Sequence, residues 1–163
     1  MIQRLQSIFL LGAGILMVLI LFFPIWQSSD MAAPATAETR PAVVEVDAFS
    51  ITYFDGTSGN ESSVAYIAAL AILSALTAFF TIFRFRNRIF QMRLGAFNLL
   101  LMSAVMGAYF IAIRTAKGML QNPADGDFLA AFYFPILAII LTMLANRFIK
   151  KDEKLVRSVD RIR

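Results

Sequence analysis

The sequence predicts an all-α membrane protein in which four transmembrane helices form an antiparallel bundle. Three observations support this fold class. Four long apolar stretches account for much of the 163 residues, and each approaches the roughly 20 residues with which a helix crosses a bilayer. The hydrophobic content is 59%, whereas a water-soluble domain is roughly half apolar. Lysine and arginine gather beside alternate ends of the stretches, which are residues 5–26, 64–83, 94–113 and 128–146.

The distribution of cations predicts the orientation of the bundle. Of 15 lysine and arginine residues, 12 lie in the N-terminus, the connection 84–93 and the segment 147–163. Cytoplasmic segments carry such an excess, so we expect both termini in the cytoplasm and residues 1–163 in a single integral membrane domain. The same placement explains the net charge of +4 through topology and anionic headgroups. Membrane lipids are therefore expected partners, and nucleic acid is not.

The first stretch, residues 5–26, has two interpretations. A signal peptide would be removed, and the Ala-Thr-Ala sequence at 35–37 resembles a cleavage site. The apolar run is longer than a signal core, however, and that site lies far beyond its end, which favours a retained helix. Pro24 is expected to kink or end this helix, and Trp26 suits the level of the lipid headgroups.

The outer loop, residues 27–63, carries six acids and one base. Its segment 31–41, rich in Ala, Pro and Thr, is typical of a flexible linker. The segment 43–54 shows an imperfect alternation of apolar residues and precedes Asp55-Gly56, a turn signal. It predicts a short β-hairpin or strand on the outer membrane surface, and an irregular loop is the alternative.

The second and third stretches are expected to pair as a helical hairpin across the connection 84–93. Both carry small residues, which let helix backbones approach closely in lipid. A dimerisation face is the alternative use of these positions. The connection has four arginines and no acid, which is typical of a cytoplasmic anchor. The small residues are Ala65, Ala68, Ala69, Ala71, Ala75 and Ala78, then Ala104, Gly107, Ala108 and Ala112.

Residues 147–163 are expected to form a cytoplasmic amphipathic tail that continues the fourth span as a helix. Apolar residues recur there at helical spacing among mostly charged positions. The apolar face has three candidate locations: the inner membrane surface, a partner protein, or water. The apolar positions are Leu155, Val156, Val159 and Ile162.

The chain contains no cysteine and no histidine. These absences exclude disulfides, thiolate metal sites, the usual haem ligand and the commonest acid/base at neutral pH. No span carries an acidic or basic residue at its centre, where ion paths and proton relays need one. We therefore predict that the protein is not an enzyme. We assign no catalytic, cofactor-binding or metal-ligating residue, and no cofactor.

Two positions inside the spans are expected to have structural roles. Asn98 carries a side-chain amide inside the third span and has reason to find an interhelical hydrogen-bond partner. Pro135 is expected to kink the fourth helix near its outer end and to leave a carbonyl unpaired. A groove for a quinone or a lipid beside this kink is the functional alternative to a packing adjustment.

Two terminal segments are distinctive: the opening Met1-Ile-Gln-Arg-Leu-Gln-Ser-Ile-Phe-Leu-Leu and the closing Lys151-Asp-Glu-Lys-Leu-Val-Arg-Ser-Val-Asp-Arg-Ile-Arg163. Together with the arginine-rich connection and Phe132-Tyr-Phe-Pro135, they resemble a family of small four-span membrane proteins from Bacteroidota. This family is catalogued as a domain of unknown function, number 4293. The resemblance implies the inner membrane of a Gram-negative cell and supplies no activity and no catalytic residues.

These observations lead to two hypotheses of function. The first is a non-catalytic integral membrane protein, an accessory or assembly component of a larger inner-membrane complex. It would engage a membrane-protein partner through its tail, its arginine-rich connection or its outer loop. The second is a small transporter, or a membrane protein that handles lipid or another apolar ligand.

Overall fold

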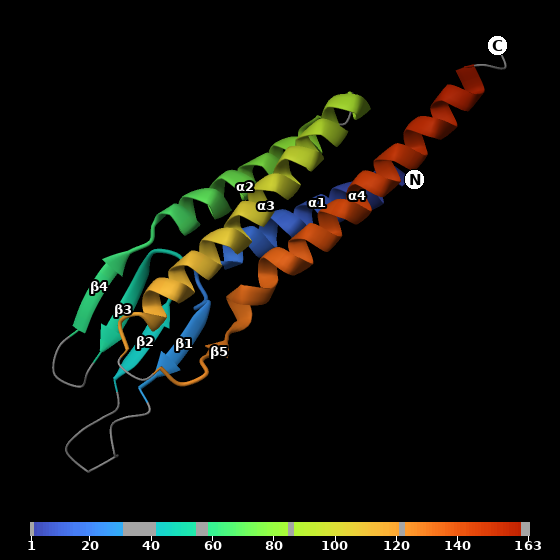
Figure 1. Cartoon of the computed structure of the whole chain (residues 1–163). Helices are drawn as coiled ribbons and strands as arrows, with labels where there is room; N and C mark the ends of the chain where they lie inside the picture. The colour runs from blue at the N-terminus through green and yellow to red at the C-terminus, as the bar shows by residue number, and fades with distance from the viewer. Residues whose placement is uncertain (1, 31–41, 55–58, 85–86, 121–122, 161–163) are drawn as a thin grey trace.

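Apolar runs of the predicted length form the helices of the structure. The computed structural model describes residues 2–30, 42–54, 59–84, 87–120 and 123–160. Three helices are long and apolar enough to cross a membrane, over Tyr66–Phe83, Arg88–Lys117 and Ala130–Lys154. The chain is therefore a membrane protein. The four helices (Figure 1) are α1 (Ile2–Leu19), α2 (Tyr66–Phe83), α3 (Arg88–Lys117) and α4 (Ala130–Asp160).

Helix α1 ends earlier than the sequence indicates. It stops at Leu19, and the chain continues in a tight turn in which Leu21 N donates to Val18 O and Phe22 N donates to Leu19 O. The predicted extension to residue 26 is wrong. Pro24 lacks a donor and disfavours helical geometry in the residue before it, so the chain leaves the helix before this position and enters a strand at Trp26.

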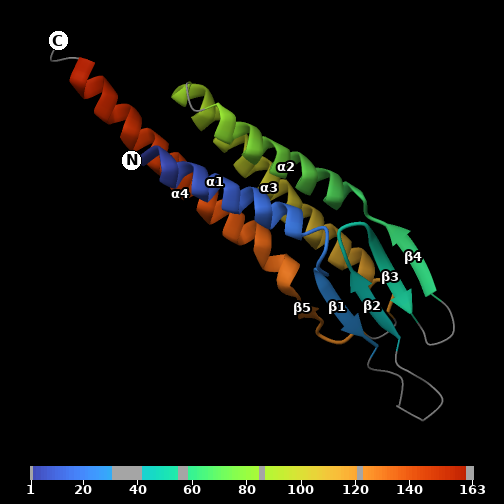
Figure 2. The ribbon, with the colours of Figure 1, turned by 180° about the vertical axis from the view of Figure 1, so that it is seen from behind.

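The predicted hairpin of the second and third spans is confirmed. Helices α2 and α3 lie side by side in antiparallel orientation, and Asn87 caps the start of α3 by accepting from Phe90 N at 3.1 Å. Helix α1 packs against α4 and α2 (Figure 2). The alanine stripe of α2 is partly buried, as expected for close packing, while Ala104 and Gly107 of α3 are exposed. The buried stripe is Ala68, Ala71, Ala75 and Ala78.

The prediction that the last span continues as a helix is also confirmed. Helix α4 runs without a break from Ala130 to Asp160, although side chains after Lys154 lie outside the described part. Its first residues beyond the apolar region are fixed to the start of α3, because Arg88 Nη1 lies 3.0 Å from Asp152 Oδ2. This part of the tail therefore packs against the bundle. The start of α1 and the end of α4 both lie at the end of the bundle opposite the sheet (Figures 1 and 2).

The all-α fold class is wrong, because a five-stranded antiparallel sheet covers one end of the helices (Figure 1). The strand order is β4-β3-β2-β1-β5. The sheet draws its strands from three separate parts of the chain, so much of its pairing is not visible as a local pattern. The strands are β1 (Trp26–Ser29), β2 (Val43–Val46), β3 (Ser50–Phe54), β4 (Gly59–Ser63) and β5 (Asp127–Phe128).

The hairpin predicted within 43–54 exists as β2 and β3. Asp47 turns the chain between them, since its Oδ1 accepts from Phe49 N at 2.7 Å and from Ser50 N at 2.8 Å. The alternation reported in the sequence places Val44 and Val46 on the buried face. The linker 31–41 and the Asp55-Gly56 turn fall outside the described residues.

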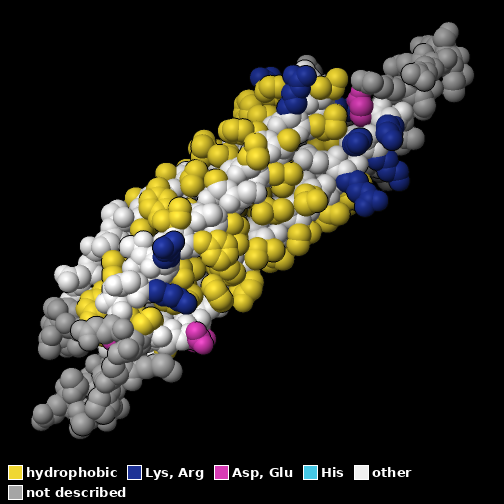
Figure 3. All heavy atoms as spheres, viewed as in Figure 1, with side chains coloured by type: hydrophobic (Ala, Val, Ile, Leu, Met, Phe, Trp, Pro, Cys, Tyr) yellow, Lys and Arg dark blue, Asp and Glu magenta, His cyan; other side chains and the backbone are white. Residues whose placement is uncertain are grey.

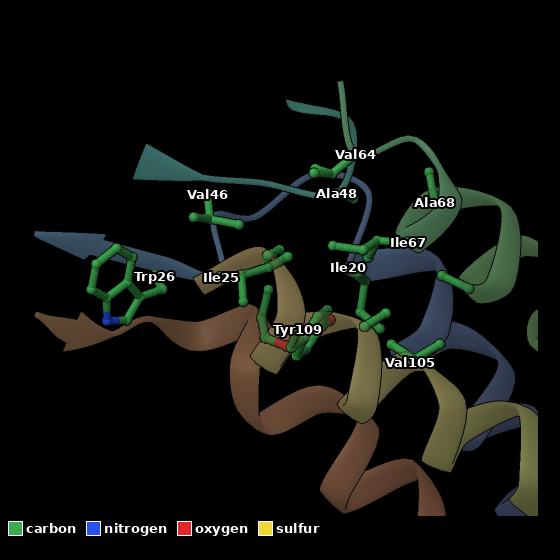
Figure 4. Close-up of a cluster of buried hydrophobic side chains, with 14 of the residues drawn as sticks. Ile20, Ile25, Trp26, Val46, Ala48, Val64, Ile67, Ala68, Val105 and Tyr109 are labelled. Carbon is green, nitrogen blue, oxygen red and sulfur yellow. The ribbon is translucent and has the colours of Figure 1, made fainter. Parts of the chain in front are cut away.

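A shared core joins the sheet to the helices (Figure 4). It contains buried side chains of the strands, of α2 and of α3, including Val46, Ile67 and Tyr109. Trp26 is only 1% exposed, so its predicted place among lipid headgroups is wrong. Its indole fits over Gly126, where a Cβ would overlap the ring and would lie 2.6 Å from Gln27 O. The sheet is thus fixed to the bundle by apolar packing.

The outer surface of the bundle carries an apolar belt with cations at both ends (Figure 3). Arg93 and Arg114 are exposed on α3 and lie 21 residues apart, which corresponds to about 32 Å of helix. This length is close to the hydrocarbon thickness of about 30 Å. Between them Leu100 is 70% exposed, a value that suits contact with acyl chains rather than water.

Candidate interaction surface

The described sheet ends in β4 on one side and β5 on the other, and β4 is the longer of these two edge strands. All five residues of β4, Gly59–Ser63, are exposed. The strand pairs with β3 on one side and ends the sheet on the other. Backbone donors and acceptors on the outer side of a terminal strand are available to an added strand. The fold therefore offers an edge on which an extended polypeptide can pair.

A hollow lies beneath β4, between the sheet and the end of α3. Its volume is about 450 Å³. The register places Asn60 opposite Tyr53 and Ser62 opposite Ile51, so polar side chains of β4 share the inner face with apolar side chains of β3. The hollow thus combines polar and apolar contacts within reach of the strand edge. Its lining is Tyr53, Asn60, Glu61, Ser62 and Met119.

This end of the molecule is acidic. The described residues of the two connections on the sheet side, 27–63 and 114–127, include six acids and two bases. Of the described acids, Glu61 lines the hollow and Glu45 is exposed in β2. The ammonium group of Lys117 makes a cation–π contact within the chain, since its Nζ lies 5.7 Å from the centre of the Trp26 ring. The surface around the edge therefore suits a basic or neutral partner segment.

The opposite end of the bundle is basic and braced by its own side chains. Arg84 lies over the rings of Phe80 and Phe90, with its Cζ 5.3 Å and 5.4 Å from their centres. Arg88 pairs with Asp152, and both side chains are about one-fifth exposed at 22% and 18%. Two arginines of the predicted cytoplasmic anchor, Arg84 and Arg88, thus contact side chains of this chain. The first residues of its connection, 85–86, are outside the described part.

Polar groups inside the bundle hold helices together. Ser74 Oγ donates to Asn98 Oδ1 at 2.7 Å, across the α2–α3 contact. The prediction that Asn98 finds an interhelical partner is confirmed. The amide of Asn146 in α4 lies against Gly95 of α3, where a Cβ would come within 2.7 Å of Asn146 Nδ2. Such contacts need a residue without a side chain on one helix.

Two glutamines that no sequence pattern singles out are buried between the helices. Gln91 was assigned to the connection, but it lies in α3, is 3% exposed and donates through Nε2 to Thr81 O at 3.2 Å. Gln6 of α1 is 5% exposed. A single glutamine at the end of an apolar stretch gives no periodic signal, so only the packed helices reveal these positions.

Pro135 interrupts the hydrogen bonding of α4, as expected. It cannot donate to the carbonyl of Ala131, and Tyr109 Oη donates to this carbonyl instead, at 3.3 Å. The ring of Tyr109 stacks on Phe132 with centroids 6.2 Å apart. The carbonyl that Pro135 leaves without a backbone donor is therefore satisfied by a tyrosine of the neighbouring helix.

Among the described residues, no group of three or more acidic side chains could hold a metal ion. Of the polar side chains inside the bundle, Ser74 bonds to Asn98, and Gln91 and Tyr109 bond to backbone carbonyls. The described arrangement can support binding and packing, and β4 is exposed at all of its residues.

Comparison with known protein families confirms the family that the sequence resembles. No curated protein matches the chain. Residues 2–162, nearly the whole chain, match the family described as Domain of unknown function (DUF4293). The chain belongs to this family.

Proposed function

We propose that the protein is a non-catalytic component of a larger inner-membrane complex, with an accessory or assembly role, and that it contacts its partner through β4. The observation that carries this proposal is the terminal strand itself, which is exposed at all five residues. An exposed strand edge normally favours self-association or aggregation unless a partner covers it. A short polar strand above a hollow that Glu61 lines suits an extended basic segment of a partner.

The proposed topology has four spans, with both termini in the cytoplasm and the sheet on the outer side. The cation excess at the end opposite the sheet supports this orientation. Helix α1 has 18 residues, or about 27 Å, which is near the thickness of the hydrocarbon layer. It presents an apolar stripe on its exposed side. This stripe consists of Leu5, Ile8, Leu11 and Ile15.

The family resemblance supports an inner membrane in a Bacteroidota cell, where the sheet would face the periplasm. A reporter enzyme fused behind residue 163 should then be active in the cytoplasm only. The same reporter inserted within 31–41 should be active in the periplasm only. Periplasmic activity of the first fusion would refute the orientation. Cytoplasmic activity of both would show that α2, α3 and α4 do not all cross the membrane, since three crossings place the two fusion points on opposite sides.

Crosslinking in living cells tests the partner. A photoreactive amino acid at Glu61, in β4, should give one discrete adduct with a second protein. The matched control is Gln27, which is exposed in β1 of the same sheet but distant in strand order from the β4 edge; it should give none. Equal labelling at both positions, or an adduct of two copies of this chain alone, would contradict the proposal.

The alternative, a protein that handles an apolar ligand, is favoured by one observation. A groove of about 370 Å³ lies on the surface of α2 and α3. Because this groove opens on the apolar belt, acyl chains of the bilayer fill it in any membrane, so we place this function second. Its lining is Leu76, Thr77, Phe80, Leu94 and Phe97.

A further inference from the structure

A second pocket lies on α4 where the apolar belt meets the basic end of the molecule. Its volume is about 310 Å³, and it is lined by Leu144, Arg147, Phe148 and Lys151. These positions are spaced by three, four and seven residues, so they share one face of the helix. They extend over about 10 Å of the helix axis. The pocket thus combines two apolar and two cationic side chains in a single row.

Both cations of the pocket are available to a ligand. Arg147 and Lys151 are exposed, and within the described residues neither has an acidic partner. They are four residues apart, which brings their Cβ atoms to roughly 5–6 Å. The neighbouring acid, Asp152, is held 3.0 Å from Arg88 of α3. The charges of the pocket are therefore uncompensated.

The apolar part of the pocket is fixed in place. The ring of Phe148 stacks on Phe9 of α1, with centroids 5.6 Å apart and an interplanar angle of 8°. Leu144 lies one helical turn deeper toward the middle of α4 and is half-buried. An apolar chain lying on Leu144 and Phe148 would therefore run along the belt, with its polar end beside the two cations.

We propose that this pocket binds an anionic phospholipid, with the phosphate between Arg147 and Lys151 and an acyl chain on Leu144 and Phe148. Basic pockets at the cytoplasmic level of spans recognise anionic headgroups through such pairs. The apolar wall distinguishes a lipid from a soluble phosphate, because only a lipid uses both halves of the pocket. The inference rests on the proposed membrane placement but not on the partner complex.

Binding of single lipids to the purified full-length chain in mild detergent tests the site, with native mass spectrometry as the readout. Wild type should bind phosphatidylglycerol in preference to phosphatidylcholine. The double variant Arg147→Gln/Lys151→Gln should bind phosphatidylglycerol about 30-fold more weakly, because each cation near an anionic headgroup contributes roughly fivefold. Arg147 and Lys151 are both exposed, so we expect the double variant to fold.

The matched control removes the same charge from the neighbouring face of α4. Lys150→Gln/Lys154→Gln should leave the affinity for phosphatidylglycerol nearly unchanged, since neither lysine lines the pocket. If both double variants lost affinity for phosphatidylglycerol equally, the binding would depend on overall surface charge and not on this pocket. That result would overturn the proposal. Equal binding of the two lipids by wild type would do the same.

A soluble competitor separates a lipid from a free phosphate. Glycerophosphoglycerol, which carries the headgroup without acyl chains, should displace the lipid poorly. Displacement at equal concentration would overturn the lipid assignment in favour of a soluble phosphorylated ligand. A failed crosslink at Glu61 leaves this experiment unaffected, so the two proposals fail separately.

Discussion

Replacing Gly126 by alanine should loosen the junction between the sheet and the bundle. The added Cβ would overlap the indole of Trp26 and would lie 2.6 Å from Gln27 O. Ordinary contacts between non-bonded heavy atoms are about 3.5–4.0 Å, so the backbone must separate by roughly 1 Å. The side chain of Gly126→Ala cannot rotate away, because its only atom is fixed by the backbone.

The loss of stability in Gly126→Ala depends on which element moves to relieve the overlap. Expelling the indole would forfeit about 4–6 kcal/mol of apolar burial. Strand β5 pairs with β1 over only two residues, so we expect β5 to move instead. Overpacking of this kind costs about 1–3 kcal/mol, and the rigid carbonyl places Gly126→Ala toward the upper end. Such a loss would lower the melting temperature by roughly 5–10 °C.

The chain has a single tryptophan, so its fluorescence reports on this junction alone. The emission of Gly126→Ala in detergent should shift to the red, and acrylamide should quench it more than in wild type. Gly107→Ala is the matched control, because a Cβ there has no neighbour within 4 Å; it should melt no earlier than wild type. A Gly126→Ala protein with the melting temperature and quenching of wild type would refute the reasoning.

Two further substitutions test the helix contacts. Tyr109→Phe should lower stability by about 1 kcal/mol, because hydrogen bonds in membranes contribute roughly 0.6–1.7 kcal/mol. The loss should shrink in a Pro135→Ala background, where a backbone N–H again reaches Ala131 O; additive losses in a double-mutant cycle would contradict this account. Gly95→Ala should cost about 1–3 kcal/mol by overlap with Asn146. Asn146→Ala should restore most of it, as measured by unfolding in SDS followed by circular dichroism, and an unchanged loss would exclude that contact as the cause.

The parts of the candidate site were predictable to different degrees. The acidic character of the outer loop and the cations flanking the last span were visible in the sequence, as was the role of Asn98. The edge strand was not, because Gly-Asn-Glu-Ser-Ser at 59–63 has neither β-branched nor aromatic residues. It forms a strand because β3 supplies the pairing. Strand β5 has two residues, and such a segment carries no periodic signal.

The sequence by itself determined the apolar helices and the asymmetry of charge, because length, composition and flanking cations act locally along the chain. Only the tertiary structure decided that Trp26 leaves the first helix to begin a sheet. It also decided that residues 100 positions apart, at Gln27 and Asp127, pair in that sheet. Backbone hydrogen bonds between strands depend on which segments meet after the helices pack, and this information is not contained in any one window of residues.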